Sequence, residues 1–315
     1  MKTITNSPVP VLLDLVKSQQ WEQVIQRCNN FATRKEFLCQ DSNSFLQTPL
    51  HLALRFKAPI DVIRSFVNHK YFNKVMEMKD TYCGYQPLHS AVRFRATSTV
   101  ISLLISKTSN QSKSKSNGSL LLEQHDRNGT NPLHIACMFG SPLEIIQVLV
   151  RANPLLLNMP TSKGKSVLFL ATECSRIGPE SLAFLLQQTT SACNDKEFDN
   201  YRGFTPLHMA CVHDRPLEIL SLLVQSDPTA CFQKTLSNQT PLASYFAHGS
   251  SREIVKLLLG PMDMDGNNVD CDGFKIDCGV IHRVLRFPQN IPDLLEFSLT
   301  PGDERKEESS DAEKL

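Results

Sequence analysis

The side chains in this sequence best suited to metal binding or acid–base chemistry are histidines that recur at one position of a repeated pattern. Each follows a Pro-Leu pair or its degenerate equivalent, as His51, His89, His134, His208 and His282. Zinc binds imidazole nitrogens at about 2 Å, so a metal site would need several of these rings to converge with Cys, Asp or Glu. Equivalent residues of a repeat array instead lie one repeat apart, too far to share an ion. We therefore expect a structural role for these histidines, and no metal.

The ten cysteines form no recognisable metal or redox motif. No Cys-x-x-Cys pair occurs, so zinc ribbons and thioredoxin-type sites lack their required spacing. Cys137 and Cys211 each follow an alanine of the repeated pattern and are expected to be small core residues. Cys271 and Cys278 leave a disulfide or redox switch open, but free thiols are the prediction for a reducing compartment.

The segment 163–166, Lys-Gly-Lys-Ser, imitates the end of a phosphate-binding loop. Such a loop begins with an earlier glycine, which lets backbone amides approach the phosphates. Met159 occupies that earlier position. We interpret the segment as a turn and expect no cofactor.

A second partial motif lies in the segment 268–279. Asn268, Asp270, Asp272 and Gly273 match the first half of a calcium-binding loop. Gly279 stands where a bidentate glutamate should complete the ligand set. An enlarged turn is the favoured interpretation, and calcium remains the alternative.

Composition excludes several classes of protein. With 41% hydrophobic and 21% charged residues and a net charge of +1, the chain is too apolar and too nearly neutral for a disordered protein. It has no apolar run of about 18 residues, the length a membrane helix requires. Its first residues lack the apolar segment of a secretory leader. We expect a cytoplasmic or nuclear location.

An internal repeat dominates the chain. Four strong copies are followed by a second apolar segment with helical spacing, such as PLEIIQVLV at 142–150. The strong copies are TPLHLALRF from Thr48, QPLHSAVRF from Gln86, NPLHIACMF from Asn131 and TPLHMACVH from Thr205, and weaker copies begin at Ser166, Thr240 and Gly279. Successive copies are 35 to 45 residues apart. The pattern predicts helix pairs that share one continuous core.

These Pro-Leu-His-x-Ala segments resemble the signature of the ankyrin repeat family, whose period is about 33 residues. The resemblance extends from about 41 to 299 and comprises about seven lengthened or degenerate repeats. It implies an all-α helical solenoid of antiparallel helix pairs with short β-turn fingers. It also implies that the histidines bond to backbone near the turns and tie adjacent fingers together. Turn residues at 126–129 agree with a finger there.

Three regions follow from the pattern. Residues 1–40 are predicted to hold an N-terminal helical capping pair, residues 41–301 the repeat region, and residues 302–315 a disordered charged tail. A polar run at 106–119 predicts a flexible loop. Val167 and Phe169 replace the proline and histidine of the fourth repeat, which predicts a less regular first turn there.

Alignment to the family places two exposed positions after each Pro-Leu-His-x-Ala segment. The partner-binding candidates are Arg55, Phe56, Lys57, Arg93, Phe94, Arg95, Met138 and Phe139. Arginine and aromatic residues are enriched at interaction hot spots. The alternatives are that the phenylalanines pack into the core and that the arginines form a solvated face. We expect the arginines of the first two repeats to stack over one another.

Charge is unevenly distributed along the chain. Residues 1–125 contain 16 Lys and Arg against 8 Asp and Glu, while residues 126–302 contain 14 against 18. The basic half should attract acidic ligands. We predict a monomeric, non-enzymatic protein-interaction module or scaffold, whose concave face and fingers bind a protein partner, with an acidic peptide or protein as the expected ligand. The alternative is binding of anionic polymer or lipid headgroups through the basic half; nucleic acid is not favoured.

Overall fold

The computed structural model describes residues 12–30, 34–41, 45–109, 122–189, 203–246 and 251–259. These residues form α-helices, short 3-10 helices, turns and irregular loops, with no β-strand in the described ranges. The chain divides into two compact units between Pro206 and Leu207. Each unit is described by itself.

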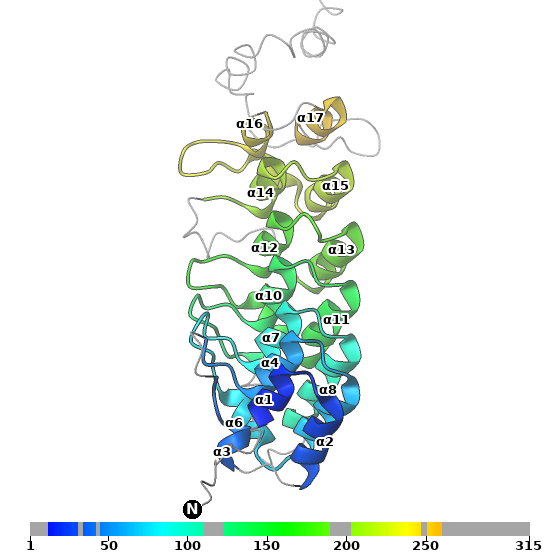
Figure 1. Cartoon of the computed structure of the whole chain (residues 1–315). Helices are drawn as coiled ribbons and strands as arrows, with labels where there is room; N and C mark the ends of the chain where they lie inside the picture. Colours follow the sequence, from blue (N-terminus) through cyan, green and yellow to red (C-terminus); the bar gives the residue numbers. More distant parts are fainter. Residues whose placement is uncertain are drawn as a thin grey trace, which may run out of the picture. The chain divides into compact units, whose positions relative to one another are not determined.

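The first unit is a stack of helix pairs (Figure 1). One column holds the first helix of each pair: α1 (Leu12–Lys17), α4 (Pro49–Arg55), α7 (Pro87–Arg93), α10 (Pro132–Met138) and α12 (Val167–Glu173). The other column holds the second helices: α2 (Trp21–Asn30), α5 (Ile60–Val67), α8 (Ser98–Ser109), α11 (Leu143–Ala152) and α13 (Pro179–Gln188). Each helix packs against the next in its own column. Short helices α3 (Arg34–Phe37), α6 (Phe72–Glu77) and η1 (Pro154–Asn158) lie between the pairs in sequence.

The first helices begin where the sequence predicts. Thr48 is the N-cap of α4, and its hydroxyl accepts a bond from the His51 backbone N–H. Asn131 caps α10 in the same way through His134. Proline occupies the first helical position in both, where a missing N–H costs nothing. Such caps contribute about 1 kcal/mol each.

The fourth repeat is more regular than predicted. Although Val167 and Phe169 replace proline and histidine, α12 has the same length as α4, α7 and α10, namely seven residues. The Ser166 hydroxyl accepts a bond of 3.1 Å from the Phe169 N–H. The expectation of an irregular first turn was therefore wrong, because the serine hydroxyl supplies the cap by itself.

Small and apolar residues of the pattern build the core between the columns. Leu50, Ala53, Leu133 and Ala136 are fully buried, as are their equivalents in the other described repeats of this unit. Cys137 is also buried, which confirms its prediction as a small core residue. Full burial of one such leucine side chain stabilises the fold by roughly 1.5–3 kcal/mol.

Neighbouring fingers are joined by backbone hydrogen bonds. Thr81 N–H donates to Phe45 O, Arg127 N–H to Cys83 O and Ser162 N–H to Asn128 O, each at 2.9 Å. The third finger is the turn predicted at 126–129, with Asp126 Oδ1 accepting bonds from the backbone of Asn128 and Thr130. The fingers of this unit extend from the first-helix column (Figure 1).

Two expectations on the chain's N-terminal half are refined. Residues 12–30 form the helix pair α1 and α2, and Lys17 of α1 forms an ion pair of 2.7 Å with Asp41. The polar run predicted as a loop at 106–119 starts later, because 106–109 complete α8. The rest of that run lies outside the described residues.

The second unit contains another set of helices. They are α14 (Pro206–Val212, which starts at the unit boundary), α15 (Leu217–Ser226), η3 (Pro228–Phe232), α16 (Pro241–Tyr245) and α17 (Arg252–Leu259). Thr240 caps α16 through Ala243 N–H. The Tyr245 hydroxyl accepts a bond from Ser251 N–H, which links α16 to the start of α17.

Several predictions fall outside the described residues. These are the seventh repeat near Gly279, the pair Cys271 and Cys278, the candidate calcium loop at 268–279 and the tail at 302–315. Across the described residues, no helix is both long and apolar enough to cross a membrane.

Candidate functional site

The repeated histidines that the structure describes are structural residues, while His282 lies outside the described residues. His51 Nε2 lies 2.9 Å from Tyr85 O, and His89 Nε2 lies 3.1 Å from Thr130 O, each in the next finger. Nδ1 of each ring accepts a bond from the backbone N–H of the helix N-cap. One nitrogen accepts and the other donates, which is the pattern of a neutral imidazole. The role implied by the family resemblance is confirmed for these two residues.

His208 of the second unit repeats the arrangement, with Nε2 3.0 Å from Gln239 O. Burial lowers the pKa of His51, His89 and His208 to about 4. These side chains therefore remain neutral at physiological pH. Within the described residues, no group of three or more His, Cys, Asp or Glu side chains is arranged to hold a metal ion.

His134 departs from this pattern. Its Nδ1 accepts a bond of 3.1 Å from Asn131 N–H, whereas its buried Nε2 makes no hydrogen bond of good geometry, and the ring interacts only weakly with the Met159 backbone. Burial, and then the nearby His125, lower its pKa to about 3. Asn131 instead reaches the following segment directly, because its Nδ2 donates to Leu156 O.

The predicted partner-binding residues lie on what we call the finger face, the surface formed by the fingers and first helices of the first unit. The Arg55 guanidinium carbon lies 5.8 Å from the centroid of the Phe94 ring. The Arg93 carbon lies 3.5 Å from that of Phe139. Each arginine thus covers the phenylalanine of the next repeat. Arg55 and Arg93 occupy equivalent positions of successive repeats, and each guanidinium lies against a ring because the ring offers a cation a favourable face.

The phenylalanines are neither fully exposed nor fully buried. Phe56, Phe94 and Phe139 are half-buried and end α4, α7 and α10 as their C-cap residues. Their backbone N–H groups donate to carbonyls of the preceding helical turn. The arginines over Phe94 and Phe139 shield part of these two rings from water.

In the first three repeats the next residue has a left-handed backbone. Lys57 and Arg95 have φ values of 54° and 57°, and Gly140 has 62° at the equivalent position. Arg95 Nη2 donates to Phe139 O at 3.0 Å and Gly140 O at 3.1 Å. Arg95 therefore also stabilises the C-terminus of α10. Lys57 is exposed.

Beyond Arg93 the finger face becomes less basic and opens into a pocket of about 380 Å³. Met138, which was also predicted to bind a partner, is 39% exposed and lines this pocket. The walls come from the second, third and fourth fingers and from α10 and α12, including Tyr85, Leu170 and Cys174. We call this the finger pocket.

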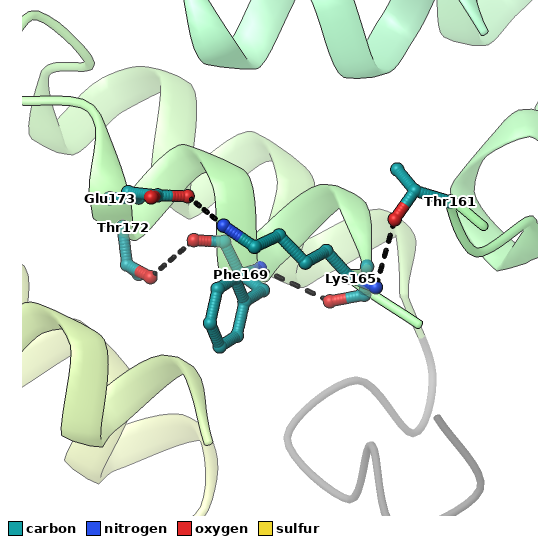
Figure 2. Close-up of polar contacts among 6 residues, drawn as sticks. Thr161, Lys165, Phe169, Thr172 and Glu173 are labelled. Carbon is teal, nitrogen blue, oxygen red and sulfur yellow. Dashed lines mark hydrogen bonds and ion pairs between the residues drawn. The ribbon is translucent and has the colours of Figure 1, made fainter. Parts of the chain in front are cut away.

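An ion pair forms one wall of the finger pocket (Figure 2). Lys165 Nζ lies 2.8 Å from Glu173 Oε2 and 5.1 Å from the centroid of the Phe169 ring. The Lys165 backbone N–H donates to the Thr161 hydroxyl, which fixes the turn of the fourth finger. The lysine that resembled part of a phosphate-binding motif is therefore held by Glu173 along α12.

Sequence reasoning missed two features of this surface. Lys165 and Glu173 are eight residues apart, and only the turn preceding α12 brings them together. At the finger tips, Phe45 and Tyr82 form an edge-to-face pair with ring centroids 5.0 Å apart, and Tyr82 is 67% exposed. Turn residues around them signalled a loop, but nothing in their spacing signalled the contact.

A different cavity lies on the second-helix column. It has a volume of about 630 Å³ and is lined from α5, α8 and α11, with Arg64, Ser102 and Arg151 among its walls. Arg64 is already paired with Asp61 at 3.1 Å. None of the predicted partner-binding residues lines this cavity.

Comparison with known proteins gives the class of this molecule. The family model described as Ankyrin repeat matches residues 128–159 and 202–231. The solved ankyrin repeat domain of Bcl-3, described as a unique member of the IkappaB protein family, aligns with a TM-score of 0.57. That alignment covers 80% of this chain and 99% of the other at 23% sequence identity, and it shows the fold alone.

Two curated proteins are related in sequence. Tyrosine-protein kinase Shark of Drosophila melanogaster is 26% identical over 273 residues, which cover 81% of this chain and 27% of the kinase. B-cell lymphoma 3 protein homolog of Mus musculus is 30% identical over 155 residues, which cover 49% of this chain and 32% of that protein. The chain thus spans about a quarter to a third of the length of these relatives. Kinase activity does not follow from such a partial match.

The stacked helix pairs and fingers define a helical repeat protein. The matched family model and the shared fold show that the chain contains ankyrin repeats. Ankyrin repeats are protein-interaction modules, and the comparisons support that class of function for this chain.

Proposed function

We propose that the chain binds an acidic protein segment through the finger face of its first unit. Arg55, Lys57, Arg93 and Arg95 would meet the carboxylates of the partner. The observation that carries the proposal is the pair of guanidinium groups held over Phe94 and Phe139. A stacked arginine keeps its N–H edges available for bidentate carboxylate bonds.

Arg55 and Arg93 also have no ionic partner in the part of the chain that the structure describes. None of the ion pairs between described residues involves Arg55 or Arg93. Arg55 Nη1 donates to Gln47 Oε1 at 3.3 Å, a neutral partner that orients the group and leaves its charge uncompensated. A fixed, unpaired cation loses less entropy on binding than a mobile one.

The wider charge distribution supports the same partner chemistry. Of the excess of eight basic residues in 1–125, six fall within 41–125, the repeats that hold the stacked arginines. Such a field increases the association rate of acidic ligands and does so less at high salt. Arg95 contributes to this field although its guanidinium also stabilises the end of α10.

The test is charge reversal with a matched control. The double variant Arg55→Glu, Arg93→Glu is compared in affinity purification with Arg151→Glu, which reverses an exposed charge beside the other cavity. We expect the double variant to lose its specific partners, with affinity reduced about tenfold to hundredfold. The control should retain them. Equal recovery of partners by all three proteins, at unchanged melting temperature, would contradict the proposal.

The same experiment separates a protein partner from an anionic polymer or lipid. Binding to phosphate polymers weakens steeply between about 50 and about 200 mM salt, regardless of sequence. We expect a modest salt effect and a protein in the purified material. Nuclease- or lipid-dependent recovery with a steep salt slope would favour the alternative.

We also propose a cytoplasmic or nuclear location and a monomeric state. All seven cysteines among the described residues are free thiols, as a reducing compartment would keep them. Fluorescence microscopy of the tagged chain tests the location, and light scattering during size-exclusion chromatography tests the state.

A further inference from the structure

We propose that the finger pocket binds one apolar side chain of the same acidic segment that contacts the arginines. The partner segment would be extended, with two acidic residues followed at regular spacing by an apolar residue. This inference rests on the proposed function and adds the sequence pattern that the surface selects.

The pattern follows from one repeated position. Arg55, Arg93, Met138 and Glu173 are the last residues of successive first helices, α4, α7, α10 and α12. Read along the column, they are cationic, cationic, apolar and anionic. An extended segment that lies across this column meets the two cations first and the methionine next.

The chemistry of the finger pocket favours an apolar ligand. Met138 and Leu170 supply apolar surface, and Tyr85 and Cys174 add largely apolar walls. Polar residues share the lining, and the two further charges among them are opposite in sign: Asn128, Thr130, Thr161, Asp126 and Lys163. Lys165 cannot readily recruit a partner carboxylate, because its ammonium is already paired with Glu173 at 2.8 Å and lies over the Phe169 ring. The pair leaves the wall close to neutral. A volume of about 380 Å³ is in the range of side-chain and small-ligand pockets.

The finger pocket and the basic residues form a continuous surface. Arg93 covers the ring of Phe139, and the adjacent residue Met138 lines the pocket. Tyr85, from the second finger, stacks on His89 with ring centroids 5.8 Å apart and also lines the pocket. A segment bound over Arg93 therefore reaches the pocket mouth without leaving the surface.

Spacing follows from helix and strand geometry. Packed helices lie about 8 to 10 Å apart, so the column positions recur at about that distance. An extended chain advances about 3.3 Å per residue, which gives about three residues per repeat. The predicted pattern is thus two acidic residues about three positions apart and an apolar residue about three positions further. The chain direction of the segment is open and would be given by the selected sequences.

The first experiment is a selection. Phage-displayed random peptides of about twelve residues, long enough for the three repeats when extended, are selected on the full chain at low salt. We expect enriched peptides that share two acidic residues and one apolar residue at the predicted spacing. Enrichment without acidic residues, or no enrichment, would overturn the proposed function together with this inference. Acidic peptides without a fixed apolar position would overturn this inference alone.

The second experiment places the apolar residue in the finger pocket. An enriched peptide and its apolar-to-Ser variant are titrated against the full chain, Met138→Ser and the control Leu155→Ser, which removes an exposed leucine outside the pocket. We expect the peptide substitution to weaken binding about tenfold in wild type and in the control. In Met138→Ser it should have little further effect, because the same contact is already lost.

Two results would overturn the assignment. One is a tenfold loss that persists unchanged in Met138→Ser, which would place the apolar residue elsewhere. The other is a loss shared by Met138→Ser and Leu155→Ser, which would indicate a general effect on the fold. Circular dichroism melting of each variant provides the folding check, since Met138 is exposed on α10 and its replacement should shift melting little.

Discussion

The guanidinium carbon of Arg93 lies 3.5 Å from the centroid of the Phe139 ring, across the boundary between two repeats. The contact fixes the position of the Arg93 guanidinium and shields one face of the Phe139 ring from solvent. Substitution of either partner should therefore change both binding and stability, in different proportions.

Arg93→Lys should weaken binding of the acidic partner several-fold although the charge is retained. Lysine lacks the planar group that stacks on the ring and donates two parallel bonds to a carboxylate. Stability should fall by less than about 1 kcal/mol, because the contact is half-exposed. Titration calorimetry and urea unfolding measure the two effects. The same substitution at Arg151, which forms no ring contact among the described residues, should leave binding unchanged.

Glu173→Gln should strengthen binding of an acidic segment. The substitution removes the counter-ion of Lys165, so the wall of the finger pocket gains a positive charge. We expect a several-fold gain in affinity at low salt that shrinks as salt screens the charge. Glu144→Gln makes the same charge change in the cavity on the second-helix column and is the control. Weaker binding by Glu173→Gln than by the control would contradict the charge pattern inferred for this face.

Gly129→Ala should destabilise the fingers. Gly129 has a φ of +71°, and an added Cβ would lie 2.5 Å from the backbone nitrogen of Ser162 in the next finger. We expect a loss above about 2 kcal/mol, since left-handed strain alone costs roughly 1–2 kcal/mol for a residue with a Cβ. Gly178→Ala, where nothing lies within 4 Å, should cost less, about 1 kcal/mol at most, through the poorer N-cap that alanine gives α13. Similar urea midpoints for both variants would argue against the described finger contact.

Acid should destabilise the fold through the buried histidines. The pKa of His89 is about 4 in the folded chain against an ordinary 6.5. The unfolded chain therefore takes up a proton first, and stability is lost as pH falls from about 6.5 towards 4. For one such histidine the loss is on the order of 3 kcal/mol at pH 4. His89→Gln should flatten this part of the pH–stability curve.

The measurement is urea unfolding of wild type and His89→Gln at several pH values. The variant should be less stable at neutral pH, because it loses the hydrogen bond from His89 Nε2 to Thr130 O. Its slope between about pH 4 and 6.5 should nevertheless be smaller than that of wild type. Parallel curves would show that His89 does not titrate on unfolding as its burial requires.

Much of the fold could be predicted because the same residue types recur at equivalent positions of each repeat. A hydroxyl or amide before the first helix, proline at its start and small residues in its middle gave the positions of α4, α7, α10 and α16. The prediction for the fourth repeat was wrong because it rested on the replaced residues Val167 and Phe169. The hydroxyl of Ser166 is sufficient to cap α12.

The surface was predicted less well, since its contacts cross between repeats. Alignment placed Arg55, Arg93 and the phenylalanines of these repeats on one face. It predicted rows of equivalent residues, arginine over arginine and phenylalanine over phenylalanine. The structure pairs unlike ones, because each arginine reaches the ring of the next repeat. Lys165 and Glu173 could not be paired from spacing, because their contact depends on the path of one turn.

The backbone bonds between fingers have a consequence for how this surface could evolve. The same type of bond joins fingers across steps of 38, 45 and 35 residues, from Phe45 to Thr81, Cys83 to Arg127 and Asn128 to Ser162. Insertions between repeats are therefore absorbed away from the joined fingers, and the alignment of neighbouring recognition positions is conserved. Linker length and binding specificity can therefore change independently in evolution. Loops between repeats could lengthen while the few side chains that contact a partner are kept or are replaced separately.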